Sequence, residues 1–139
     1  MQSSRPLWVG RSGSRGMRIS MSDQSGSTGW SYSNYARSVT ETRTIGSVTN
    51  QASTTTSDWL GRVLTVAYPG STTETLTYQY DALGRAKNFS SDAQTGNLAD
   101  LAYNTLSQLT TVSLRNGVGI TNTYDSTTNR LSERKAALS

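Results

Sequence analysis

Short stretches in which apolar and polar residues alternate recur along the chain. In Glu74–Tyr80 the apolar side chains Leu76, Tyr78 and Tyr80 occupy every second position, with threonine and glutamine between them. A period of two places these three side chains on one face of an extended strand. The run 62–68, which reads RVLTVAY, is of the same kind. The pattern therefore predicts strands with one modestly apolar face.

Clusters of Gly, Asn, Asp and Pro separate these runs and supply the backbone conformations that tight turns require. One set of clusters lies near residues 70, 94 and 116. A second set, near residues 59, 82, 105 and 127, alternates with the first along the chain. The runs that remain are about six or seven residues long, the usual length of a strand. A hint of helical periodicity is found at 132–138. We therefore expect an all-β fold: an antiparallel meander of repeated β-hairpins that forms one curved open sheet.

One of the two turn types recurs in sequence. Residues 80–85 read YDALGR, and residues 57–62 read SDWLGR. Softer copies start at Tyr103, at Tyr124 with one residue inserted, and at Tyr32, so that the five starts are 25, 23, 23 and 21 residues apart. A near-constant period of this length indicates a structural repeat. The residues that define the repeat are Tyr32, Asp58, Gly61, Arg62, Tyr80, Asp81, Gly84, Arg85, Tyr103, Tyr124, Asp125 and Arg130.

The residue types of the repeat suit structural roles. Asp81 can accept hydrogen bonds from backbone amides of the turn, and Gly84 permits a positive φ. Arg85 begins the next strand, where its guanidinium can cover a tyrosine ring or pair with an acid. The tyrosines are expected to pack on the sheet face, one per repeat.

The pattern Tyr-Asp-x-x-Gly-Arg, repeated at this period, resembles the YD-repeat or RHS-repeat family over residues 18–134. The match is most specific at 57–62 and 80–85. In that family the repeats form a strip of β-hairpins that spirals into a hollow shell around a toxic segment. Related repeats occur in bacterial toxin complexes and in cell-surface adhesion proteins. The resemblance implies a structural or binding strip, part of an RHS-type shell, of secreted or cell-surface origin.

The expected organisation is a flexible basic leader at 1–17, a strip of about five repeats at 18–135 and a tail at 136–139. The leader carries several arginines before the first acid, Asp23, but no nucleic-acid-binding motif accompanies them. We therefore do not expect nucleic acid as a partner. The chain shows no signal peptide, and no apolar run is long enough to span a membrane.

The amino-acid composition excludes several kinds of catalytic and metal-binding site. The chain has no Cys and no His, which excludes disulfides, zinc fingers and catalysis by Ser–His–Asp or Cys–His groups. Only 33% of the residues are hydrophobic, too few for a thick core. The seven Tyr and three Trp argue against a disordered chain.

Calcium is the one metal that the residues suggest, because oxygen ligands suit hard cations. The best loop is 92–97, in which Asp92 and Gln94, with Asp100 beyond, are candidate ligands. A resemblance to short YD-repeat-like proteins implies an alternative function: calcium-dependent hydrolysis of acyl-homoserine lactones. That reaction would need a cation to polarise the carbonyl and a carboxylate to activate water. The sequence identifies no catalytic residue for it.

Two expectations concern partners. Open edge strands and an uncovered apolar face favour a homo-oligomer, formed through the edges or through a face that contains Val66, Leu76, Tyr78 and Tyr80. A third function, a carbohydrate-binding module, follows from aromatic side chains such as Trp30 and Trp59 beside many hydroxyl groups. A sugar or a small lactone is then the expected ligand.

Overall fold

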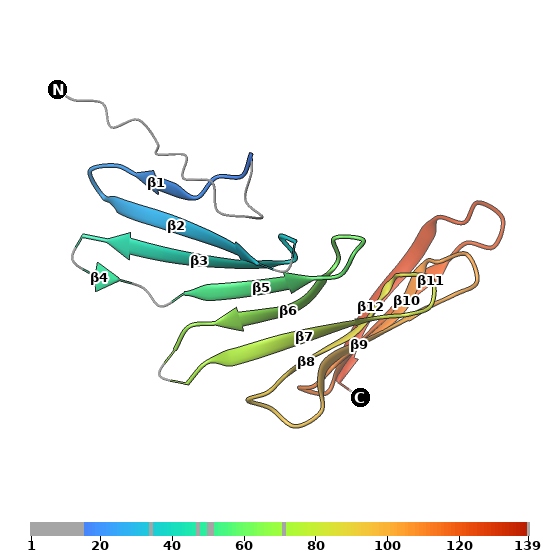
Figure 1. Ribbon diagram of the computed structural model, residues 1–139. Coiled ribbons are helices and arrows are strands. Elements are labelled where there is room, and N and C mark those ends of the chain that lie inside the picture. Colours follow the sequence, from blue (N-terminus) through green and yellow to red (C-terminus); the bar gives the residue numbers. More distant parts are fainter. Residues whose placement is uncertain (1–15, 34, 47, 50–51, 71, 139) are drawn as a thin grey trace. The chain divides into compact units, whose positions relative to one another are not determined.

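The computed structural model describes residues 16–33, 35–46, 48–49, 52–70 and 72–138 (Figure 1). Within these ranges the chain is all-β and contains no helix. The strands in chain order are β1 (Ser20–Ser22), β2 (Gly26–Ser33), β3 (Ser38–Ile45), β4 (Val48–Thr49), β5 (Ser53–Ser57), β6 (Val63–Tyr68), β7 (Glu74–Tyr80), β8 (Ala86–Ser91), β9 (Asn97–Tyr103), β10 (Leu109–Leu114), β11 (Val118–Tyr124) and β12 (Leu131–Leu138). The predicted all-β class is confirmed.

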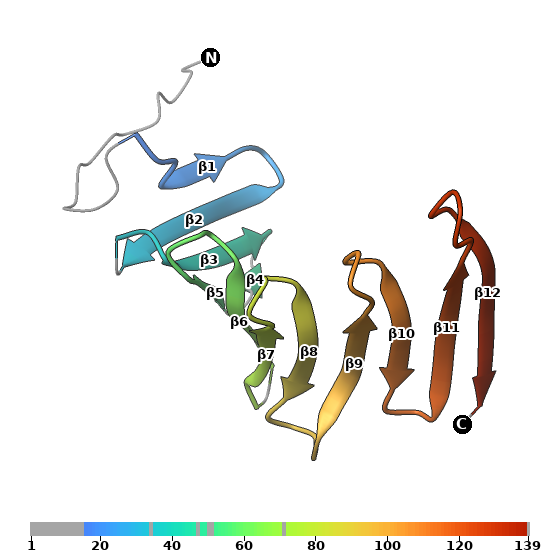
Figure 2. The same cartoon turned by 90° about the vertical axis from the view of Figure 1, so that its right-hand side faces the viewer.

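The strands follow one another in chain order in a single antiparallel sheet, except that the short β4 pairs with β3 outside this path. Figure 2 shows the succession from β8 to β12, with neighbouring strands running in opposite directions. The connections fall where the turn-forming residues predicted them, for example 81–85 between β7 and β8 and 92–96 between β8 and β9. The predicted open meander of hairpins is therefore confirmed.

The helical pattern at 132–138 was misleading. Leu131–Leu138 forms β12, which pairs with β11 and places Ala136 opposite Ile120 and Lys135 opposite Thr121. The alanines near the end of the chain favour a helix locally, but ladder hydrogen bonds to β11 outweigh this weak preference. Strand pairing with β11 runs through Leu138.

The chain divides into two compact units, residues 1–75 and 76–139. In the first unit β2 and β3 pair over eight residues. Threonine hydroxyls link neighbouring strands, with 2.9 Å between the oxygens of Thr40 and Thr54 and 2.5 Å between those of Thr56 and Thr65. Such cross-strand pairs explain how a threonine-rich sequence stabilises a sheet. Most of the predicted leader, residues 1–15, lies outside the described residues.

The second unit has one apolar and one polar face. Cross-strand partners share a face, so the register defines each row across the sheet. The residues of two such rows, Tyr78, Phe89, Ala99, Leu114, Leu101, Val112, Ile120 and Ala136, form a surface that we call the apolar face. The row Asn88, Asp100, Ser113 and Gly119 belongs to the opposite, polar face.

The sheet has almost no fully buried core. Among the described residues Ala99, 2% exposed, is the single buried hydrophobic residue, and no large side chain is fully buried. Thr28, Asn88 and Ser91 are the buried polar residues of the same ranges. Because one layer of sheet cannot enclose side chains on both sides, most apolar residues of the face stay half-buried.

Candidate functional site

The connection between β5 and β6 and that between β7 and β8 share one hydrogen-bond pattern. In the second of these, Asp81 Oδ1 accepts bonds from the backbone amides of Leu83 and Arg85, both at 2.9 Å. The Asp81 amide donates to the Arg85 carbonyl, and the Gly84 amide donates to the Asp81 carbonyl. Asp81 Oδ2 accepts from Arg85 Nε at 2.6 Å. One aspartate thus closes the turn and holds the arginine that directly precedes the next strand.

The turn at 58–62 repeats these contacts bond for bond. Asp58 Oδ1 accepts from the amides of Leu60 at 2.8 Å and Arg62 at 3.0 Å, and Asp58 Oδ2 accepts from Arg62 Nε at 2.6 Å. The glycines also correspond, since φ is 79° at Gly61 and 80° at Gly84. This left-handed conformation is easy for glycine and strained for other residues. The two turns, in different units, therefore have one local structure.

The softer copies keep the backbone pattern with other side chains. Asn104 Oδ1 accepts from the amides of Leu106 and Gln108, both at 3.0 Å, and Asn104 Nδ2 donates to Gln108 Oε1 at 2.6 Å. Ser107 takes the glycine position with a φ of 63°. An amide pair here replaces the carboxylate–guanidinium pair.

The turn at 125–130 accommodates its extra residue without losing the aspartate. Asp125 Oδ1 accepts from the amides of Thr127 and Thr128 and from the Thr128 hydroxyl. The Asp125 amide donates to the Arg130 carbonyl at 2.8 Å, and Asn129 adopts a φ of 57°. The side chain of Arg130 is exposed, unlike those of Arg62 and Arg85.

Neighbouring turns on the same side of the sheet contact each other. The Arg85 guanidinium lies 4.5 Å from the centroid of the Tyr103 ring, and Arg85 Nη1 donates to Ser107 Oγ at 3.1 Å. Gln108, at the arginine position of the next turn, donates from Nε2 to the Asn129 carbonyl at 2.7 Å. The residue that follows each of these turns therefore ties its own repeat to the next one.

The tyrosines of the repeat lie on strands and are half-buried. Tyr124 donates from its hydroxyl to the Leu109 carbonyl at 2.9 Å, and Tyr32 donates to the Arg18 carbonyl at 2.7 Å. Tyr103 receives the Arg85 guanidinium, and Tyr80 ends β7 next to the turn. These contacts fix the strand ends from which the turns project.

The turn hydrogen bonds lower the pKa of the aspartates. Partial burial alone raises the pKa of Asp58 and Asp81, but hydrogen bonds from the following arginine and the turn amides outweigh it, so each pKa lies below its ordinary value. The amide and hydroxyl of Thr128 lower the pKa of Asp125. A carboxylate whose pKa is depressed is a poor general base at neutral pH.

A β-bulge accompanies each of these four connections. The register shifts between Thr56 and Ser57, between Gln79 and Tyr80, and between Thr123 and Tyr124. On β10 the shift lies between Leu109 and Thr111. The sequence interpretation missed these bulges, which recur beside the same turn type; one more register shift, between Phe89 and Ser90, lies beside the other turn type.

The candidate calcium ligands lie away from these turns, in the connection between β8 and β9 and on β9 itself. Asp92 and Gln94 are exposed in the connection between β8 and β9, and Asp100 lies on β9, where it accepts from Asn97 Nδ2 at 2.7 Å. Its cross-strand partner Asn88 has a buried Oδ1 without a hydrogen bond. In the described part of the chain no three His, Cys, Asp or Glu side chains lie close enough to share a metal ion. Within those residues, neither Asp92 nor Asp100 therefore belongs to such a group of three.

The first unit exposes an aromatic pair at its turns. Tyr35, 84% exposed, and Trp59, 75% exposed, have ring centroids 6.3 Å apart. The Arg37 guanidinium lies 3.8 Å from the Trp59 centroid. Tyr35 has a φ of 57°, a conformation that is unusual for an aromatic residue. Trp30, by contrast, is half-buried and donates from Nε1 to Glu41 at 3.0 Å.

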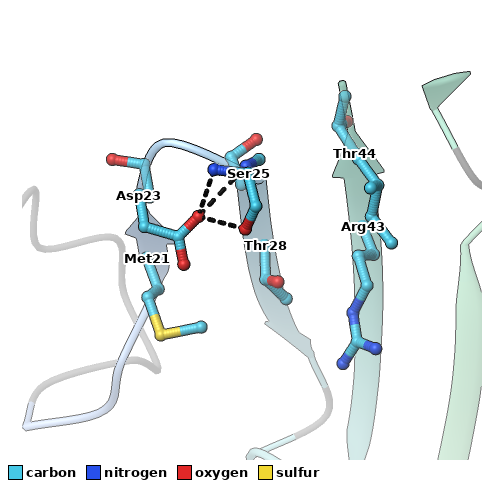
Figure 3. A pocket seen from close by; sticks show the side chains of 10 residues that line it. Met21, Asp23, Ser25, Thr28, Arg43 and Thr44 are labelled. Carbon is cyan, nitrogen blue, oxygen red and sulfur yellow. Dashed lines mark hydrogen bonds between the residues drawn. The ribbon is translucent and has the colours of Figure 1, made fainter. Parts of the chain in front are cut away.

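A shallow pocket of about 190 Å³ lies beside the turn between β1 and β2 (Figure 3). Asp23 and Arg43 line it, but both are engaged: Asp23 Oδ1 accepts from the amide and hydroxyl of Ser25, and Arg43 pairs with Glu41 at 3.0 Å. The Ser25 hydroxyl and the turn amides also hold the pKa of Asp23 below its ordinary value. The two charged side chains of this pocket thus stabilise the local structure.

No helix of the described chain is long and apolar enough to cross a membrane. No protein-family model matches the chain, and no curated protein matches it. Solved structures match it by fold. One of them, the crystal structure of TcdB2-TccC3-Cdc42, matches 87% of this chain with a TM-score of 0.64 and 20% sequence identity. The match spans 7% of that chain. At this identity it shows a common fold.

Proposed function

We propose that the chain is a structural strip of YD/RHS-type repeats, of the kind that builds the wall of a β-shell. The observation that carries this proposal is the repeated turn, in which the aspartate and the arginine bond to each other and to the turn itself. Side chains engaged in this way stabilise a repeat and have little capacity left for a substrate. In repeat proteins, stability comes from such contacts within and between neighbouring repeats.

Two further findings support a wall-building role. The arginine or glutamine that follows a turn contacts the next turn, as Arg85 and Gln108 do, so repeats can be added without changing the pattern. The fold match, which spans 7% of a much longer chain, is consistent with a short strip as part of a larger wall. The expected role follows from the repeat itself and requires no cofactor.

A direct assay separates this role from the hydrolase alternative. Hydrolysis of acyl-homoserine lactones by the purified chain is measured with added calcium and with a chelator. A structural strip is expected to leave the uncatalysed rate unchanged under both conditions. Turnover that needs calcium, and that is lost in Asp92→Ala or Asp100→Ala, would contradict the structural role and assign the site.

The exposed aromatic pair supports a second candidate function, the binding of a carbohydrate. Aromatic rings present an apolar face on which a ligand ring can pack, and Tyr35 and Trp59 lie together at the surface with the Arg37 guanidinium beside them. Binding of oligosaccharides can be followed by Trp fluorescence and calorimetry. Trp59→Ala should abolish binding if this function is correct, whereas Trp30→Phe serves as the control because Trp30 is half-buried and bonded to Glu41. Absence of binding across neutral and charged glycans would remove this candidate.

A further inference from the structure

The apolar face of the second unit has no covering layer among the described residues. Phe89, Leu101, Val112 and Ile120 are all half-buried, and Tyr78 and Phe89 stack on this face with centroids 5.8 Å apart. Domains ordinarily bury such a face against a second layer of secondary structure. The side chains are thus already ordered side by side within the sheet, but their outer surfaces remain in contact with water.

The side of the sheet that carries the apolar face is large enough for a stable interface. Strands β7 to β12 are spaced about 4.8 Å apart, and about seven residues at ~3.3 Å each give this side, with the apolar face and the residues that flank it, a footprint of roughly 650 Å². Two such faces in contact would bury about 1,300 Å², which is within the range of roughly 1,200–2,000 Å² for specific protein interfaces. A partner of the same size and shape would therefore be sufficient.

The distribution of charge favours a second copy of the chain over a charged partner. Three acids of this unit, Asp81, Asp92 and Asp125, lie in the turns. The other two lie on the polar face, Asp100 on β9 and Glu133 on β12. Two apolar faces can meet without burying a carboxylate, which would be costly. Arg134, opposite Asn122 on the outer strand β12, would lie at the rim.

We propose that the apolar face binds the apolar face of a second copy, so that two chains form a two-layer β-sandwich around a two-fold axis. Twisted sheets pack in this way about 10 Å apart, with strands roughly aligned. The contact is isologous, since the same surface serves in both chains. The inference depends on the two faces of the sheet and is independent of the structural role proposed above.

Neighbouring residues of β11 provide a matched test, because Ile120 lies on the apolar face and Thr121 on the polar face. Light scattering of the full chain over a concentration series should give about 30 kDa, twice the 15.0 kDa of one chain. Ile120→Lys would bury a charge in each copy and should weaken the dimer by about 100-fold or more. Thr121→Lys should leave the dimer intact. A dimer that survives in folded Ile120→Lys, or is lost in Thr121→Lys, would overturn the proposal.

A second test uses small substitutions that do not threaten the fold. Because the chain has no cysteine, a single thiol reports on one position without interference. In Val112→Cys the thiol faces the partner, and a short bis-maleimide should yield a covalent dimer, whereas Ser113→Cys on the polar face should remain monomeric in denaturing gels. Cross-linking of Ser113→Cys instead would show that another surface associates. A wild-type mass of 15.0 kDa at every concentration would show that the chain is a monomer. Either result would overturn the proposal.

Discussion

Asp81 shows how one side chain can determine a local structure. Its two carboxylate oxygens accept from two backbone amides and from the Arg85 guanidinium, a set of contacts that lies within five residues. Local chemistry of this kind can be predicted from sequence, because aspartate and glycine prefer turns for reasons that involve only their neighbours. The forward contact from Arg85 to Tyr103 could not be predicted in the same way, since it depends on the distance between successive turns.

The glycine position gives the first prediction. Gly61 has a φ of 79°, and an added Cβ would meet nothing within 4 Å, so Gly61→Ala should cost about 1–2 kcal/mol of unfolding free energy through backbone strain alone. Gly119→Ala is the matched control: this glycine has no positive φ, and its added Cβ would lie 3.9 Å from the Ala137 carbonyl oxygen. Its stability should be unchanged or higher by up to about 1 kcal/mol. Urea unfolding measures both, and equal effects would refute the strain argument.

The turn aspartates give the second prediction, on pH. Their folded-state pKa values lie below the ordinary value, so their contribution is complete above the unfolded pKa of about 4 and is lost as the pH falls through the lower folded pKa. Stability from these groups should be constant from neutral pH to about pH 5 and should decrease below it. Urea midpoints across this range provide the measurement.

A substitution identifies the groups responsible. Asp81→Asn retains acceptors for the turn amides, as Asn104 does, but removes the ionisation, so the decrease in acid should become smaller. Asp100→Asn removes a carboxylate outside these turns and should leave most of the acid sensitivity in place. Equal sensitivity in wild type and Asp81→Asn would mean that the turn carboxylate has no role in it.

The order of the hairpins could be predicted from sequence, but the contacts at their junctions could not. The strand order could be predicted because each hairpin needs only its own turn, and the turns are spaced one strand length apart. The conformation of the tail could not be predicted, since its alanines favour a helix. Leu131–Leu138 forms a strand because β11 lies beside it. The bulges beside the four turns likewise arise from pairing between strands, and no residue type marks them in sequence.

The junction between turns gives the third prediction. Arg85 pairs with Asp81, lies over Tyr103 and bonds to Ser107, so Arg85→Lys should lower the melting temperature by several degrees, because lysine lacks the planar fork and the stacking surface. Arg130→Lys is the matched control, as the Arg130 side chain is exposed at the equivalent place in the last turn. A similar melting temperature for both variants would show that the forward contact contributes nothing.

At the scale of the whole molecule, the chain has many ladder and turn hydrogen bonds and very little core. With Ala99 as the buried hydrophobic residue of the described chain and 33% hydrophobic residues overall, most of its stability must come from contacts between adjacent strands and repeats. The low apolar content predicted a thin structure with an uncovered face. The same pattern predicted that a second copy associates through the sheet edges or this face, and the sandwich proposed above is one specific form of that expectation.

Thermal unfolding of four aspartate variants, each with millimolar calcium and with a chelator, tests most directly whether the repeat residues have structural roles. Asp58→Ala and Asp81→Ala should lower the melting temperature by several degrees in both conditions, because each loses the acceptor of two turn amides and the partner of an arginine. Asp92→Ala and Asp100→Ala should change it little, with or without calcium. Turn variants that melt like wild type, or a calcium-induced rise that Asp92→Ala or Asp100→Ala removes, would contradict the structural account.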